Sequence, residues 1–114
     1  MAKIIKFWMP VLMCMGLIFY MSSIPGTNIP SVIPFQNIIY HSGVFFILAL
    51  VFKRALKNTS RLTYGKIIVS TLIFGIIYAF TDELHQAYVP NRTVSGFDVF
   101  IDALGVTLGS LIYR

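Results

Sequence analysis

The sequence predicts an all-α membrane protein in which four transmembrane helices form a small bundle. Of its 114 residues, 57% are hydrophobic and only 11% are charged, whereas soluble domains have about 45–50% apolar and about 25% charged residues. The apolar residues also gather into four runs along the chain. A chain of this length forms one domain, residues 1–114, and we expect no separate soluble catalytic module.

Four apolar segments are expected to form the helices. Each is close to the lower limit of about 17–25 residues that cross about 30 Å of hydrocarbon as a helix. A membrane β-barrel would instead need segments of about 10 residues with strict apolar–polar alternation, and the run from Phe45 to Leu48 does not alternate. The predicted helices are Ile4–Met21, Asn37–Phe52, Lys66–Thr81 and Phe97–Tyr113.

The first segment has some features of a secretory signal peptide, since Lys3 and Lys6 precede the apolar run and Ser23 follows it. A cleavage site needs small residues at both key positions, and Met21 spoils the pairing with Ser23. We therefore expect the segment to be retained. The single cysteine, Cys14, lies in this segment, which excludes an intrachain disulfide and a cysteine-based metal site; we expect it to be a packing residue.

The distribution of Lys and Arg predicts that both termini are cytoplasmic. Cytoplasmic connections carry an excess of these residues, and residues 22–36 hold none of them while residues 84–96 hold one. Those two connections are therefore expected on the outer face. The net charge of +5 fits attraction to anionic lipids in the cell membrane, and we expect no nucleic-acid partner. The basic residues on the cytoplasmic side are Lys3, Lys6, Lys53, Arg54, Lys57, Arg61, Lys66 and Arg114.

The acidic residues are the strongest functional signal. All four of them, Asp82, Glu83, Asp98 and Asp102, fall within 21 positions of an otherwise apolar chain. An Asp at the centre of a membrane helix costs about 2.5–3.5 kcal/mol, so retained ionisable residues indicate a functional site. The same stretch contains His85.

Helical periodicity groups the polar side chains of the third segment. Asp82, His85 and Gln86 stand at i, i+3 and i+4 and share one helix face, while Glu83 points about 100° away. We therefore expect Asp82 and His85 to act as a pair.

The fourth segment also has a polar face. Asp98 and Asp102 stand at i and i+4, in line with Gly105 and Gly109, whose small-xxx-small spacing lets another helix approach closely. This face is expected to look into the bundle. Under the predicted topology, four helix ends bring polar residues to the same outer level: Ser22, Ser23, His41, Asp82, His85, Gln86, Asp98 and Asp102.

These residues resemble the pattern of the VanZ-like family of small bacterial and archaeal membrane proteins. The resemblance covers essentially the whole chain in the right order, and it implies a multi-pass membrane protein linked, through the family's namesake, to resistance against teicoplanin-type glycopeptides. The matching residues are Ser22-Ser23-Ile24-Pro25, His41, Asp82-Glu83-Leu84-His85-Gln86, Val89-Pro90-Asn91-Arg92, Asp98, Asp102, Gly105 and Gly109.

The chain departs from the family pattern around the second helix. The family often has an Asp-Lys or Arg-Lys pair shortly before the histidine and a Phe directly after it, whereas this chain has Asn37, Ile38 and Ser42 there, and Phe45 stands where a Tyr is common. Any role of that basic pair is therefore in question here. The usual glycine of the Pro-Gly-Arg turn is Asn91, a mild change because Asn tolerates a left-handed backbone.

Three hypotheses for the site remain open. The first is an enzyme or binder for a lipid-linked envelope precursor, in which Arg92 and His41 hold phosphate and Asp82 and His85 exchange a proton. The second is a divalent-metal site, but no motif such as His-Glu-x-x-His supports it, and we expect neither a metal nor a cofactor. The third is a non-catalytic protein whose polar network fixes the helices, or which binds a glycopeptide. The oligomeric state is not indicated.

Each candidate residue also has a structural interpretation. His41 can be an interfacial side chain bonded to a carbonyl, Glu83 a solvated rim charge, and Arg92 a side chain that extends to lipid headgroups. Asp98 and Asp102 can belong to a helix-joining hydrogen-bond network. Under the first hypothesis, catalytic roles are expected for Asp82, His85, His41 and Glu83, and binding roles for Arg92, Gln86, Ser22, Ser23, Asp98 and Asp102.

Overall fold

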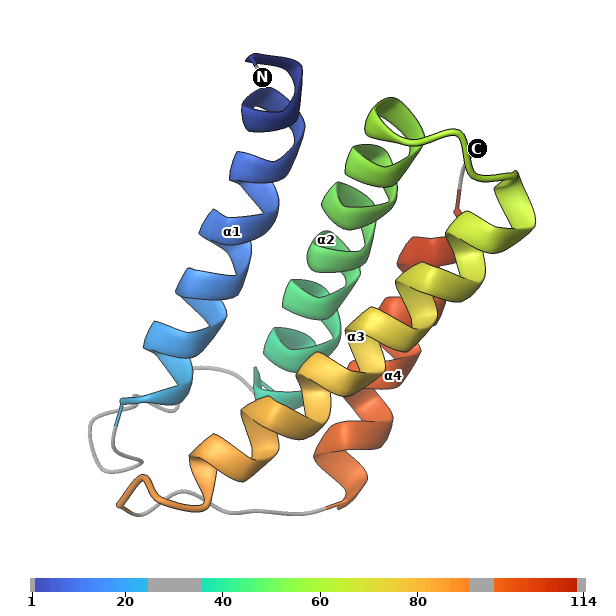
Figure 1. Ribbon diagram of the computed structural model, residues 1–114. Coiled ribbons are helices and arrows are strands. Elements are labelled where there is room, and N and C mark those ends of the chain that lie inside the picture. The colour runs from blue at the N-terminus through green and yellow to red at the C-terminus, as the bar shows by residue number, and fades with distance from the viewer. Residues whose placement is uncertain (1, 25–35, 91–95, 113–114) are drawn as a thin grey trace.

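The protein is a bundle of helices that lie side by side along a length of 45 Å (Figure 1). The structure is a computed structural model that describes residues 2–24, 36–90 and 96–112. Within these ranges the chain forms four helices and no strand, which confirms the predicted all-α fold. The helices are α1 (Ala2–Ser22), α2 (Gln36–Thr59), α3 (Tyr64–Gln86) and α4 (Gly96–Leu111).

Three of these helices are long and apolar enough to cross a membrane: α1, α2 from Ile38 onward, and α3. The fourth helix, α4, has 16 residues, which corresponds to about 24 Å at 1.5 Å per residue. It is therefore shorter than the apolar core of a typical bilayer, about 30 Å.

The second helix extends further than its apolar run predicts. The charge pattern predicts a cytoplasmic loop that starts at Lys53, but α2 continues to Thr59 and includes this residue. The Lys53 side chain is buried, and its ammonium donates hydrogen bonds to the Ser110 carbonyl at 2.6 Å and to the Tyr64 hydroxyl at 3.3 Å. These contacts with α3 and α4 explain why a charged residue does not end the helix. Only residues 60–63 connect α2 to α3, and Thr63 caps the start of α3.

Glycine residues let α4 approach α2 closely. A Cβ atom on Gly105 would overlap the Ser42 carbonyl oxygen, and one on Gly109 would lie 2.6 Å from the Phe46 carbonyl oxygen. Both separations are shorter than real Cβ atoms tolerate. The close approach predicted from the Gly105–Gly109 spacing is therefore confirmed, and its partner is α2.

The first helix packs mainly on α2 and leaves much of its apolar surface exposed. Near its start, the Trp8 ring meets Phe52 edge-on at 5.5 Å and its indole donates a hydrogen bond to Thr59 at 3.0 Å. Val11 and Ile18 of the same helix belong to the hydrophobic core. Such an exposed apolar helix surface is expected of a protein embedded in lipid.

One end of the bundle gathers the polar residues. The last turns of α1 and α3 lie beside the first turns of α2 and α4 at this end, while the start of α1 and the end of α2 lie at the other (Figure 1). The antiparallel order of the four helices therefore brings residues that are some 60 positions apart in the sequence into one place.

Candidate functional site

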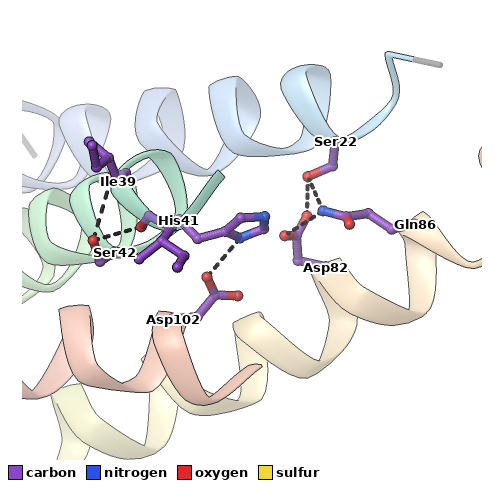
Figure 2. Close-up of polar contacts among 8 residues, drawn as sticks. Ser22, Ile39, His41, Ser42, Asp82, Gln86 and Asp102 are labelled. Carbon is purple, nitrogen blue, oxygen red and sulfur yellow. Dashed lines mark hydrogen bonds and ion pairs between the residues drawn. The ribbon is translucent and has the colours of Figure 1, made fainter. Parts of the chain in front are cut away.

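Each of the four helices contributes to a cluster of buried polar side chains. Ser22 comes from the last turn of α1, His41 from the second turn of α2, Asp82 and Gln86 from the end of α3, and Asp102 from the second turn of α4. Their exposed fractions lie between 0% and 6%. We call these five residues the buried polar cluster, and Figure 2 shows them facing one another across the helices.

His41 and Asp102 form the central pair of the cluster. His41 Nδ1 lies 2.8 Å from Asp102 Oδ1, between side chains that are 1% and 0% exposed. The pair joins α2 to α4 three residues from Gly105, whose close approach to Ser42 sets the spacing between these helices. His41 is therefore not an interfacial side chain bonded to a carbonyl, because its partner is the buried Asp102 carboxylate. A carboxylate bonded to a histidine fixes the orientation and tautomer of its ring.

Asp82 forms the second part of the cluster. The Ser22 hydroxyl donates a short hydrogen bond to Asp82 Oδ1. The Gln86 amide donates to Asp82 Oδ2 at 3.3 Å and to the Ser22 oxygen at 3.5 Å. The one-turn spacing between Asp82 and Gln86 therefore forms the shared face that the sequence predicts, and this face joins α3 to α1.

His85 lies at the rim, outside the cluster. Its Nε2 atom is 2.8 Å from the Ser23 hydroxyl, and its ring stacks on Phe19 at 4.4 Å with an interplanar angle of 21°. The Ser23 hydroxyl also donates to the Phe19 carbonyl at 2.8 Å. Because that hydroxyl has one proton, His85 Nε2 acts as the donor to Ser23 in this arrangement.

The histidine–carboxylate pairs in the structure differ from the predicted one. The sequence paired Asp82 with His85, which share a helix, whereas the described contacts join Asp82 to Ser22 and Gln86, and His85 to Ser23. The histidine that bonds an aspartate is His41. Spacing within one helix predicted which residues share a face, but it carried no information on the partner from another helix.

The predictions for the remaining candidate residues have different outcomes. Glu83 is only 6% exposed, so its interpretation as a solvated rim charge is wrong. Asp98 is half-buried in the first turn of α4. Arg92 and the Asn91 departure lie outside the described residues. Ser42, another departure, donates to the Ile38 carbonyl of its own helix at 2.9 Å.

Two atoms of the buried polar cluster have no hydrogen-bond partner within the described ranges. These are His41 Nε2 and Asp102 Oδ2, the atoms that the His41–Asp102 hydrogen bond does not use. His41, Asp82 and Asp102 each offer one metal-binding atom, and these three atoms lie within 4.8 Å of one another. The chemistry open to the cluster is therefore proton exchange between imidazole and carboxylate, or coordination of a cation.

A buried lysine at the opposite end was not predicted as important. Lys53 is 1% exposed, binds the last turn of α4 through the Ser110 carbonyl, and lies over the Tyr64 ring at 4.9 Å. The last carbonyls of a helix lack partners within it, so Lys53 caps α4. The sequence signal that could have identified Lys53 is the helical periodicity, which continues beyond Phe52.

Comparison with known proteins supports the resemblance. A family model described as VanZ/LLP1 matches residues 7–114, nearly the whole chain. The chain belongs to the VanZ/LLP1 family. No match was found among curated proteins or among solved structures. Together with three helices able to cross a membrane, the family match makes the chain a VanZ-like membrane protein.

Proposed function

We propose that this VanZ-family protein spans the cell membrane four times, with both termini in the cytoplasm and the buried polar cluster near the outer face. The basic residues support this orientation, because the starts of α1 and α3 and the end of α2 lie at the end opposite the cluster. Cytoplasmic ends are enriched in Lys and Arg. The supporting residues at that end are Lys3, Lys6, Arg54, Lys57, Arg61 and Lys66.

The exposed surface of α4 supports its assignment as the fourth span. Phe97, Phe100, Leu104 and Leu108 are between 43% and 62% exposed, while Asp102 and both glycines are buried against the bundle. An apolar outer stripe over a polar inner face is the pattern of a helix that faces lipid on one side. A short span is compatible with local thinning of the bilayer.

The function proposed for the site is binding, at the outer face, of a cell-envelope ligand such as a lipid-linked precursor. The observation that carries this proposal is the convergence of polar side chains from all four helices at one end. At the rim, His85 and Ser23 form a polar pair outside the buried polar cluster, and the sequence places Arg92 in the following connection. The family resemblance links such a function to tolerance of teicoplanin-type glycopeptides.

A second candidate is a structural network that holds the four helices together without a ligand. The observation in its favour is the near-complete burial of the cluster, between 0% and 6% exposed. Hydrogen bonds between membrane helices contribute about 0.6 kcal/mol each on average, so a network of this size would affect stability measurably. Under this candidate, only the amount of folded protein would depend on the cluster.

The rim histidine separates the two candidates. His85→Gln keeps a hydrogen-bonding group and alters no contact within the buried polar cluster. If the site binds an envelope ligand, the variant should fold at wild-type level and lower glycopeptide tolerance in a suitable host to that of cells without the protein. Lys66→Gln, an exposed residue at the start of α3, is the control. Wild-type tolerance in His85→Gln, with tolerance in cluster variants falling only in step with folded protein, would favour the structural candidate.

A further inference from the structure

We propose that the buried polar cluster contains a divalent transition-metal site formed by His41, Asp82 and Asp102. The three residues come from α2, α3 and α4 and are far apart in the sequence. The fold nevertheless brings one ligand atom of each within 4.8 Å of the others. This site goes beyond the proposed envelope function and does not depend on it, because a bound ion can either take part in ligand binding or hold the helices together.

The unpartnered atoms of the cluster point to a ligand. His41 Nε2 and Asp102 Oδ2 are buried and have no hydrogen-bond partner among the residues that the structure describes. A buried polar atom left without a partner costs about 1–3 kcal/mol, and more where the group is charged. A cation bound at His41 Nε2 removes this cost for the imidazole.

The orientation of His41 fits metal binding. Its Nδ1 atom is held by Asp102, and Figure 2 shows the ring between the two aspartates, with its other nitrogen directed toward Asp82. The Asp82 carboxylate is held by Ser22 and Gln86, which supply the kind of outer hydrogen bonds that orient a metal ligand.

The donor set selects the kind of ion. One imidazole and two carboxylates combine a borderline nitrogen ligand with hard oxygen ligands, which suits first-row ions such as Zn²⁺ and Mn²⁺. Mg²⁺ and Ca²⁺ prefer oxygen ligands alone, so they should bind more weakly. A dication also balances the two buried carboxylates, whose charge is costly in a low-dielectric interior.

The test is a metal-binding measurement on the purified, detergent-solubilised full chain. After removal of metal with a chelator, Zn²⁺ is added, excess is removed by desalting, and retained metal is measured by mass spectrometry. We expect about one Zn²⁺ per chain. Loss of an outer hydrogen-bond partner of a metal ligand costs about 10–100-fold in affinity, so His41→Gln and Asp102→Asn, which alter ligands directly, should weaken the affinity by at least that much. His85→Gln and Asp98→Asn make the same two chemical changes outside the three proposed ligands and should retain wild-type affinity.

A second measurement keeps the test valid if the cluster variants do not fold. Wild-type protein loaded with Co²⁺ should show visible absorption bands typical of a site with imidazole and carboxylate ligands, and Zn²⁺ should displace the Co²⁺ and raise the unfolding temperature. Absence of stoichiometric metal in the wild-type protein would overturn the proposal, as would equal loss in the two control variants. The proposed envelope function has a separate test, since wild-type glycopeptide tolerance in His85→Gln would contradict it without affecting the metal proposal.

Discussion

The contact between α4 and α2 can be tested by replacing Gly105 with alanine. The added Cβ would overlap the backbone oxygen of Ser42, and a backbone oxygen cannot rotate away as a flexible side chain can. The overlap leaves the Cβ about 1 Å short of ordinary van der Waals contact, so α4 must move by about that amount. Asp102 lies on the same face one turn earlier, and its hydrogen bond with His41, 2.8 Å long, would stretch beyond the usual limit of about 3.2 Å.

The size of the effect follows from two opposing terms. Overpacking a well-filled interface costs about 1–3 kcal/mol, and loss of the His41–Asp102 bond adds to that cost, while alanine favours the helix by about 1 kcal/mol over glycine. We expect Gly105→Ala to lower the free energy of unfolding by about 2 kcal/mol in total. Gly43 lies in α2 with nothing within 4 Å of an added Cβ, so Gly43→Ala should be neutral or more stable by up to about 1 kcal/mol.

Reversible unfolding of the two variants in mixed detergent micelles, followed by circular dichroism, measures this difference. A thermal scan of the same samples is an independent check. Equal stability of Gly105→Ala and Gly43→Ala would refute the close approach of α4 to α2, and with it the argument that glycine packing positions Asp102 beside His41.

Two further predictions concern the orientation of the bundle and its opposite end. In a Cys14→Ala background, an impermeant thiol reagent applied from outside intact cells should label Tyr88→Cys, since Tyr88 is 83% exposed, but it should not label Leu62→Cys. The reverse labelling pattern would invert the proposed topology. Lys53→Met should destabilise the protein by about 1–3 kcal/mol, because the last turn of α4 loses a buried donor. Lys66→Met, at an exposed position, should be neutral in the same unfolding assay. Equal effects of the two substitutions would contradict the capping role of Lys53.

Helix positions were predictable from the sequence, but several helix ends were not. Hydropathy located the cores of all four helices, because an apolar run is a local property of the chain. It ended the second helix at Phe52, whereas α2 continues to Thr59. The charged residues beyond Phe52 predict the start of a loop, and only the contacts of Lys53 with α3 and α4 show why the helix continues.

The site was predictable as a location and only partly as a set of contacts. The concentration of acidic residues between Asp82 and Asp102, and the polar residues expected at one level, identified the end of the bundle that holds the cluster. The burial of Glu83 and the separation of His85 from Asp82 were not predicted, because both depend on how helices from distant parts of the chain surround α3.

By itself the sequence determined that this is a helical membrane protein of the VanZ type, and which helix faces carry polar groups. Composition and helical spacing are enough for that, since each concerns residues that are close along the chain. Only the tertiary structure decided that His41 pairs with Asp102, and that Ser22 bonds Asp82. The partners in each pair are about 60 residues apart. His41 meets Asp102 because Gly105 lets α4 lie directly against α2, a distance that no pattern within one helix specifies.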